Sequence, residues 1–182
     1  HVAKRLADKV AQIITNSLPV ANLFSASHRH EVVLSGGVVY PRLGTLVGPH
    51  AVETFARMHA DVAVLSGSGL SEDGIYNSHA LLVDIQRAMI AGAAKVIFCF
   101  DHTKFGRRST FFLADFSAVD IIVTDAAAPA PLMRMTPMAA GGAPLDKAKI
   151  VSPIMSRFPQ RRAGRTRPPM AAGTGAQSFF FA

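Results

Sequence analysis

Short apolar runs and amphipathic segments alternate along the first 125 residues of the chain. The clearest run is Val96–Phe100, which is apolar at every position and leads directly into polar residues. A run of this kind is typical of a parallel strand that helices cover on both faces of the sheet. Further strands are expected at Val10–Thr15, Glu31–Leu34, Asp61–Leu65 and Ile121–Thr124.

Segments with apolar residues at helical spacing separate these strands. The longest is His79–Ala94, one face of which carries Leu82, Ile85, Met89 and Ala93. Shorter helices are expected at Val2–Asp8, Pro19–Ser25 and Pro49–Met58, and a loop from Gly67 to Asn77. Strands that alternate with helices predict an α/β fold with a mostly parallel, Rossmann-like sheet flanked by helices.

The composition changes near Ala126, where Pro, Gly, Ala and Arg become frequent. We therefore divide the chain into a globular body, residues 1–130, and a basic tail, residues 131–182, that is expected to be disordered. Phe179-Phe180-Phe181 near the end is predicted to be an exposed apolar cluster without a partner. Two alternatives stay open for the tail: an arm that contacts nucleic acid, or a stretch that is not natural coding sequence.

The net charge of +7 is confined to that tail. Residues 1–130 hold 11 Lys and Arg against 11 Asp and Glu, whereas residues 131–182 hold 8 basic residues and one acid, Asp146. A body without net charge attracts a phosphate backbone only weakly, so the folded part is not expected to bind nucleic acid by itself.

Other features of the composition narrow the class of protein. There is no run of 18 apolar residues, so we expect no membrane span and no membrane partner. No signal peptide is recognisable and the single Cys99 excludes an intrachain disulfide, so a cytoplasmic location is expected. His28-Arg29-His30 lacks further ligand residues, and we expect neither a metal nor a cofactor.

Polar groups and glycines recur where the predicted strands end. In an open α/β sheet, ligands bind outside the carboxyl ends of the strands, and glycines let backbone amides approach an anion. One such segment is most often a plain turn, but the recurrence at every strand predicts a site for a small anionic ligand. The segments are Thr15-Asn16-Ser17, Ser35-Gly36-Gly37, Ser66-Gly67-Ser68-Gly69, Asp101 with Lys104, and Thr124-Asp125.

The pair that follows Val96–Phe100 has the most specific chemistry. Lys104 can meet a phosphate as a point charge, and Asp101 can accept hydrogen bonds from hydroxyl groups. The alternative is a solvated loop with an ordinary surface ion pair. His102 lies in the same loop and can face either a ligand or water.

Taken together, these segments resemble the C-terminal effector-sensing domain of the DeoR family of bacterial transcription regulators. The order and approximate spacing of the family are kept from about residue 1 to 130. The matching segments are Ile14-Thr15-Asn16-Ser17-Leu18-Pro19-Val20-Ala21, Leu34-Ser35-Gly36-Gly37, Val47-Gly48-Pro49, Asp61 with Gly67-Ser68-Gly69, Gly74, Arg87-Ala88-Met89-Ile90, Asp101-His102-Thr103-Lys104-Phe105-Gly106 and Asp120-Ile121-Ile122-Val123-Thr124-Asp125.

The resemblance implies a fold related to sugar-phosphate isomerases and a phosphorylated sugar as the effector. It also implies a repressor that reads operator DNA through an N-terminal winged helix-turn-helix, and it leaves open a homo-oligomer. The effector site is then expected to include Thr15, Asn16, Gly36, Gly37, Gly67, Ser68, Gly69, Asp101 and Lys104.

Three departures from the family pattern are visible. No helix-turn-helix precedes His1, so operator DNA is expected to be bound only through a region that this chain lacks. The family's Asp-Ser-Gly-Thr-Thr phosphate loop and its strand, expected just ahead of Val2, are missing. Asp84 and Gln86 stand where the family usually has a Glu and a Lys before Arg87.

Three functions therefore stay open. We favour the effector-binding domain of a repressor, which is not an enzyme. The second is an isomerase-like enzyme, in which Asp84 or Asp101 would act as the base beside Lys104. The third is a truncated product without function.

Overall fold

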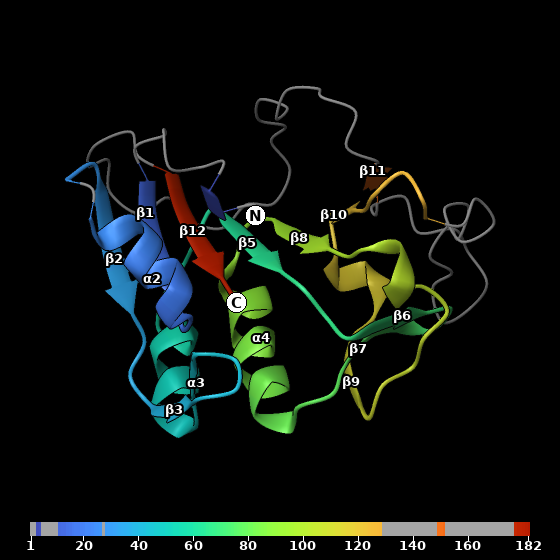
Figure 1. The fold of residues 1–182 in the computed structure, drawn as a ribbon, viewed down its shortest axis with the longest axis horizontal. Coiled ribbons are helices and arrows are strands. Elements are labelled where there is room, and N and C mark those ends of the chain that lie inside the picture. Colours follow the sequence, from blue (N-terminus) through green and yellow to red (C-terminus); the bar gives the residue numbers. More distant parts are fainter. Residues whose placement is uncertain (1–2, 5–10, 27, 129–148, 152–176) are drawn as a thin grey trace.

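A parallel sheet forms the centre of the molecule in the computed structural model, which describes residues 3–4, 11–26, 28–128, 149–151 and 177–182 (Figure 1). The sheet has seven strands in the order β11-β10-β8-β5-β12-β1-β2. Every neighbouring pair runs parallel, so all carboxyl ends lie at one edge. The strands are β1 (Ala11–Thr15), β2 (His30–Leu34), β5 (Val62–Leu65), β8 (Val96–Cys99), β10 (Ile121–Val123), β11 (Lys149–Val151) and β12 (Gln177–Phe181).

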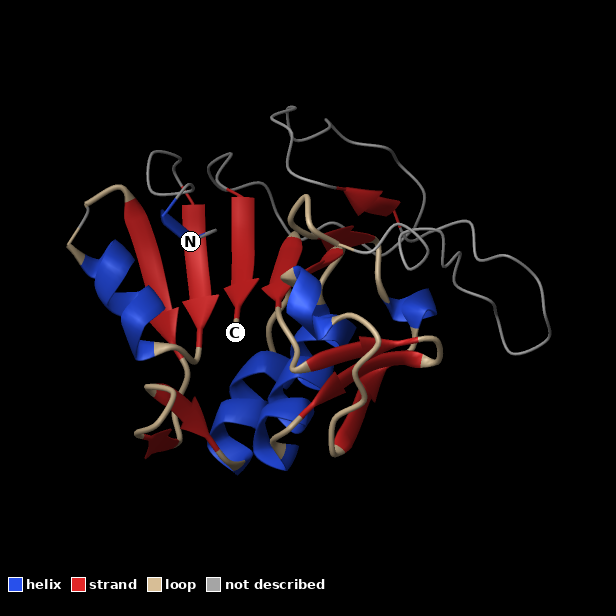
Figure 2. Ribbon diagram, turned by 45° about the vertical axis from the view of Figure 1, so that its right-hand side comes forward, coloured by secondary structure: helices blue, strands red, loops and turns tan. Residues whose placement is uncertain are grey.

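Helices cover both faces of this sheet (Figure 2). Helices α3 (Pro49–Ala56) and α4 (Ala80–Gly92) pack Phe55, Ile85 and Met89 into one apolar cluster. Helix α2 (Leu18–Ser25) packs Phe24 into a second cluster. The expected α/β architecture is therefore confirmed.

Most predicted elements of the body are present, with bounds that differ by at most two residues. These elements could be predicted because the sequence of each one carries its own apolar pattern or capping residue. Helix α2, for example, begins where the Ser17 hydroxyl accepts a hydrogen bond from the backbone N–H of Val20, and Pro19 lies in the first turn. Of the helix predicted at Val2–Asp8, only Ala3 and Lys4 lie within the described residues, and both are helical.

The expectation that Phe179-Phe180-Phe181 has no partner is wrong. These residues form the second half of β12, at the centre of the sheet, between β1 and β5. Their exposed fractions are 4%, 0% and 4%. Phe180 belongs to the cluster with α3 and α4, and its two neighbours belong to the cluster with α2. A strand buried on both faces is apolar at consecutive positions, so its sequence shows no alternation.

The predicted tail therefore contributes two strands to the sheet, β11 at its edge and β12 at its centre. The disorder expected for the tail concerns residues 131–148 and 152–176, which lie outside the described residues. The division at residue 130 stays a prediction for those segments.

The loop expected between Gly67 and Asn77 is wrong in part, since it contains a hairpin. Strands β6 (Gly69–Ser71) and β7 (Gly74–Asn77) pair antiparallel and form a small sheet with β9 (Phe111–Ala114). Glycine and asparagine are poor strand formers, so propensity alone does not indicate these strands. Gly74 has φ +141°, and a Cβ there would lie 2.5 Å from the Ala114 carbonyl oxygen. A second small sheet pairs β3 (Val38–Tyr40) with β4 (Thr45–Val47).

Two short 3₁₀ helices complete the described secondary structure, η1 (His102–Lys104) and η2 (Phe116–Ala118). No helix among the described residues is long and apolar enough to cross a membrane.

The position of Phe180 leads to a stability prediction. Phe180→Ala should lower the free energy of unfolding by about 3–5 kcal/mol, because it leaves a cavity between the sheet and α3. Phe111→Ala, at a side chain that is 38% exposed, is the matched control and should cost less than about 1 kcal/mol. Urea denaturation of both variants measures the difference. If Phe180→Ala lowered the free energy of unfolding as little as the control does, β12 would not be a core strand.

Candidate functional site

The parallel sheet brings the polar strand ends of the sequence prediction to one edge, in two groups. Thr15 is the last residue of β1 and Asn16 follows it, and Gly36 and Gly37 follow β2. The other group follows β5, β8 and β10. Strand β12 lies between the two groups, because its neighbours are β1 and β5.

Thr15 and Asn16 are completely buried and hold the end of β1 in place. The Thr15 hydroxyl donates to the Phe181 carbonyl oxygen at 2.9 Å and accepts from the Ser17 N–H at 3.0 Å. The Asn16 amide nitrogen donates to the Leu46 carbonyl oxygen at 3.1 Å. Thr15 is thus fully engaged within the fold, whereas the Asn16 Oδ1 has no hydrogen-bond partner among the described residues.

Other buried oxygens at this edge share that property. Ser35, Thr45 and Thr124 are each at most 9% exposed, and their hydroxyl oxygens have no partner among the described residues. Ser35 is joined to the end of β1 by its N–H, which donates to the Thr15 carbonyl oxygen at 2.9 Å, and Thr45 forms a bridge with Ser17. A buried polar atom without a partner costs about 1–3 kcal/mol, so such groups commonly await water or a ligand.

Gly36 and Gly37 carry the chain from β2 over the start of α3. Gly37 has φ +125°, and a Cβ there would lie 2.5 Å from the Val47 carbonyl oxygen, so only glycine fits. Gly36 is exposed, and a Cβ there would make an ordinary contact with His50 at 3.6 Å. Both glycines are exposed, but the positive φ and the approach of the Val47 carbonyl require glycine only at residue 37.

Gly67, Ser68 and Gly69 pack closely against neighbouring backbone where the chain enters the hairpin. A Cβ at Gly67 would lie 2.8 Å from the Tyr76 carbonyl oxygen, and one at Gly69 would lie 2.3 Å from that of Arg107. The Ser68 N–H donates to the Tyr76 carbonyl oxygen at 2.9 Å. The Ser68 amide is thus paired within the fold, and the role of the three residues in binding an anion stays a prediction.

The Gln86 side chain has a structural role that the sequence did not indicate. Its side chain is 4% exposed and donates from Nε2 to the Ser66 carbonyl oxygen at 2.7 Å. Its Oε1 accepts from the Asn77 amide nitrogen at 2.8 Å. Gln86 therefore ties α4 to the ends of β5 and β7, and a neutral amide suits this buried position because it both donates and accepts.

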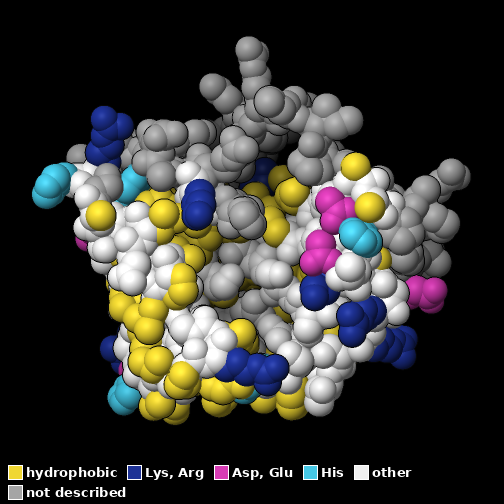
Figure 3. Space-filling model, in the orientation of Figure 1, with side chains coloured by type: hydrophobic (Ala, Val, Ile, Leu, Met, Phe, Trp, Pro, Cys, Tyr) yellow, Lys and Arg dark blue, Asp and Glu magenta, His cyan; other side chains and the backbone are white. Residues whose placement is uncertain are grey.

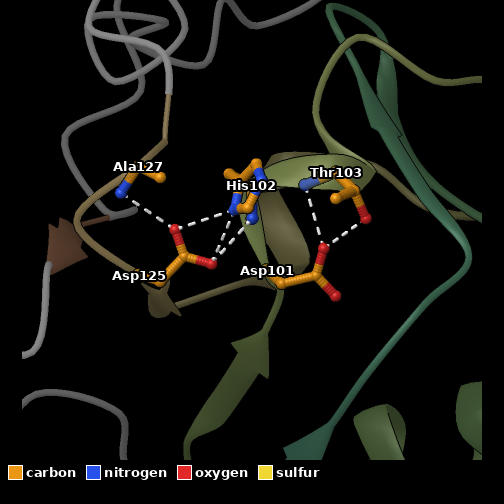
Figure 4. A network of polar contacts seen from close by, with 5 residues as sticks. All are labelled: Asp101, His102, Thr103, Asp125 and Ala127. Carbon is orange, nitrogen blue, oxygen red and sulfur yellow. Dashed lines mark hydrogen bonds and ion pairs between the residues drawn. The ribbon is translucent and has the colours of Figure 1, made fainter.

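Asp101 and Lys104 lie on the turn that follows β8. Figure 4 shows Asp101 beside Thr103 on this turn. The Asp101 carboxylate caps η1, accepting from the Thr103 N–H at 2.9 Å and from the Thr103 hydroxyl. These bonds, the hydroxyl first, hold the pKa of Asp101 below its usual range. Lys104 is half-buried and forms no ion pair with another described residue within 4 Å. The turn therefore presents an unpaired ammonium beside an ionised carboxylate.

Asp125 fixes this turn to the end of β10, a contact that the sequence did not identify. Its carboxylate accepts from the His102 N–H at 3.0 Å and lies 3.1 Å from the His102 Nδ1, and it also accepts from the Ala127 N–H at 3.0 Å (Figure 4). The His102 N–H, followed by the His102 ring, holds the pKa of Asp125 below its usual range. In the neutral ring, a proton on Nδ1 leaves Nε2 free to accept a hydrogen bond.

The surface over this turn is mixed in charge. Figure 3 shows acidic, basic and histidine side chains side by side on the face that carries η1 in Figure 1. No group of three or more His, Cys, Asp or Glu side chains that could hold a metal ion occurs within the described ranges. The arrangement suits hydrogen bonding and charge recognition of a polar anion.

Comparison with known proteins agrees with this geometry. The sequence profile of the family described as "DeoR C terminal sensor domain" matches residues 1–126. The glycerol-3-phosphate regulon repressor of Escherichia coli (strain K12) is 31% identical over 127 residues, which are 68% of this chain and 50% of the relative.

Two further relatives have similar coverage. The HTH-type transcriptional repressor GlcR of Bacillus subtilis (strain 168) is 32% identical over 123 residues, 68% of this chain and 48% of the relative. The L-fucose operon activator of E. coli (strain K12) is 25% identical over 126 residues, 69% of this chain and 52% of the relative. The chain thus spans about half the length of the relatives that it matches.

The clamp on Asp125 predicts a pH-dependent stability. Because folding lowers the pKa of Asp125, its contribution should be complete above the unfolded value of about 3.9 and should be lost as the pH falls through the lower folded value. Asp125→Asn should therefore be less stable than the parent at pH 7, and the gap should narrow as the pH is lowered below about 4. Urea midpoints across this range measure it.

The matched control is Asp84→Asn, on the exposed face of α4. That variant should keep the parent's pH profile. A gap for Asp125→Asn that stays constant down to pH 2 would show that the carboxylate does not act through its charge.

Proposed function

We propose, from the premise that this chain belongs to the DeoR C-terminal sensor domain family, that it binds a phosphorylated sugar on behalf of a transcription regulator. The observation that carries this proposal is the turn after β8. It holds the Lys104 ammonium, which forms no ion pair within the described part of the chain, at the carboxyl edge of a parallel sheet, where open α/β folds bind their ligands. A phosphate is the anionic group that such a cation meets as a point charge.

The sugar moiety needs hydrogen-bonding groups that the fold does not use. Asp101 has a second carboxylate oxygen, and Asn16 Oδ1 is buried without a partner among the described residues. Neutral sugar hydroxyls can donate to both acceptors. Since β12 and β5 lie between β1 and β8, an effector that contacts both groups would sit over the ends of these two central strands.

The phosphate loop of the family would also lie over the ends of the central strands. A strand joined to β1 through the helix at Ala3 and Lys4 would pair with β1 by a right-handed crossover. One side of β1 is taken by β2, so the other side, where β12 lies, is the position for such a strand. A phosphate loop at its end would fall between Asn16 and Ser66, which supports an effector bound over the centre of the edge.

The geometry favours a sensor over the alternative of an isomerase. A general base works best with a pKa near the working pH, and the hydrogen bonds from Thr103 hold the pKa of Asp101 low. Asp84, the other carboxylate considered, lies on the exposed surface of α4. The relatives are named as a regulon repressor, an HTH-type transcriptional repressor and an operon activator, and none of these names is that of an enzyme. We assign contact with operator DNA to the half of these proteins that this chain does not span.

The test is the affinity of the full chain for glycerol 3-phosphate, glucose 6-phosphate and fructose 1-phosphate, measured by calorimetry. Lys104→Ala should weaken binding ten- to a hundredfold, because it removes a charge-assisted contact worth about 1.5–3 kcal/mol. The melting temperature should hardly change, since Lys104 adds little to the apolar core.

Lys95→Ala is the matched control, because Lys95 lies at the amino end of the same strand, β8. Its affinity should equal that of the parent. Equal affinities in all three proteins would show that Lys104 is an ordinary surface lysine, and a collapsed melting temperature for Lys104→Ala would show that it is structural. Exchange of the proton beside the sugar carbonyl in D₂O would favour the isomerase.

A further inference from the structure

Two buried polar side chains lie next to each other where β1 and β2 end. The two strands pair in parallel up to Thr15, which lies opposite Leu34. The ladder continues by one more bond, because the Ser35 N–H donates to the Thr15 carbonyl oxygen at 2.9 Å. The residues that follow the last pair, Asn16 and Ser35, are therefore neighbours across the two strands.

Both side chains belong to the face of the sheet that α3 and α4 cover. Ile14, two residues before Asn16, is part of the apolar cluster with these helices, and Val33, two residues before Ser35, packs against the same cluster. Successive side chains of a strand point to opposite faces, so residues two apart share a face. Asn16 is 0% and Ser35 is 3% exposed, so the two meet in the interior.

The hydrogen bonds that these two side chains still lack are complementary. The Asn16 nitrogen donates to the Leu46 carbonyl oxygen at 3.1 Å, and since a carbonyl oxygen only accepts, this contact fixes which amide atom is the nitrogen. Asn16 Oδ1 therefore needs a donor. Neither it nor the Ser35 hydroxyl has a partner in the described ranges, so the two do not bond to each other either.

One hydroxyl group of a ligand would satisfy both atoms. Neighbouring strands lie about 4.8 Å apart, and two O–H···O bonds of about 2.8 Å that meet at one oxygen at about 120° span the same distance. Such a hydroxyl donates to Asn16 Oδ1 and accepts from the Ser35 hydroxyl. An ionised phosphate or carboxylate oxygen cannot donate, and a C–H group leaves both atoms without a partner.

The surroundings of this pair are uncharged and close to the surface. The Leu46 carbonyl oxygen holds the Asn16 amide, and the Val47 carbonyl oxygen would lie 2.5 Å from a Cβ on Gly37. Gly36 and Gly37, directly after Ser35, are both exposed. A neutral hydroxyl suits this position better than an ionised group, because backbone carbonyl oxygens repel an anion.

We propose that Asn16 and Ser35 form a subsite that recognises one hydroxyl of the effector, and that Ser35 is a specificity-determining residue for the sugar. The inference rests on the proposed function, in which Lys104 meets the phosphate. The ligand class is a sugar phosphate with a free hydroxyl at the end remote from the phosphate. An analogue with hydrogen in that place would leave two buried oxygens unpaired, which is the strongest form of discrimination that a polar site offers.

The test compares D-glucose 6-phosphate with its three analogues that lack the hydroxyl at carbon 1, 2 or 3, by calorimetry on the full chain. For the parent, at least one analogue should bind about tenfold more weakly or worse. Ser35→Ala should weaken glucose 6-phosphate and reduce that difference to less than about twofold, because the variant no longer donates to the hydroxyl.

Ser25→Ala is the matched control, since Ser25 is an exposed serine at the end of α2. This variant should keep the discrimination of the parent. Equal affinities of the parent for glucose 6-phosphate and all three analogues would overturn the proposal. A difference that persists unchanged in Ser35→Ala would overturn it as well, because another residue would then recognise the hydroxyl.

Melting temperatures without sugar separate a ligand subsite from a site for a permanent water molecule. Removing a buried hydroxyl that has no partner is neutral or stabilising, so Ser35→Ala should melt at or above the temperature of the parent. A clearly lower melting temperature would show that the hydroxyl holds a structural water, and it would refute the subsite.

Unphosphorylated D-glucose tests the subsite independently of the phosphate. In NMR spectra of the labelled chain, it should shift the side-chain amide resonance of Asn16 in the parent and in Ser25→Ala, but not in Ser35→Ala. If glucose 6-phosphate does not bind and glucose still shifts this resonance, the proposed function is wrong and the subsite stands. If neither sugar shifts it, the subsite is refuted.

Discussion

The simultaneous pairing of β12 with β1 and β5 is the constraint on which the rest of the structure depends. Without a strand in that position, β1 and β2 would share no sheet hydrogen bonds with the other four strands, which are β5, β8, β10 and β11. Buried backbone groups need partners, so the position cannot stay empty inside a closed core. Phe180 also supplies the ring that joins the sheet to Phe55 of α3. One short segment thereby connects the two halves of the sheet and completes the packing on both faces.

The same constraint sets the geometry of the candidate site. Strands in a sheet lie about 4.8 Å apart, so the ends of β1 and β8 are separated by three spacings, or about 14 Å. Asn16 lies on one side of this span and Lys104 on the other. The Thr15 hydroxyl is bonded to the Phe181 carbonyl oxygen, so the end of β12 is fixed to the end of β1. The distance between the two groups of polar residues is therefore a property of the strand between them.

Local patterns in the sequence predict the alternating body well, because strands such as Val96–Cys99 and helices such as Ala80–Gly92 carry their own apolar periodicity. They do not predict β12, because its pairing with β1 joins residues 166 positions apart and depends on an empty place in the sheet. The predicted site is similarly divided. Asp101 and Lys104 lie at the carboxyl edge as expected, but Gly67 and Gly69 are explained by backbone that approaches from β7 and Arg107. The clamp of Asp125 on His102 joins two strand ends and has no local signal.

Chemical shift mapping of the isotopically labelled full chain, titrated with glycerol 3-phosphate, tests most directly whether the effector binds over the centre of the carboxyl edge. The account predicts that the largest shift changes fall on the ends of β1, β5, β12 and β8, including Asn16, Gly67 and Lys104. Residues at the amino edge, such as Lys95 and Asp120, should stay unchanged. Shift changes concentrated at the amino edge, or on the small sheet of β6, β7 and β9, would contradict it.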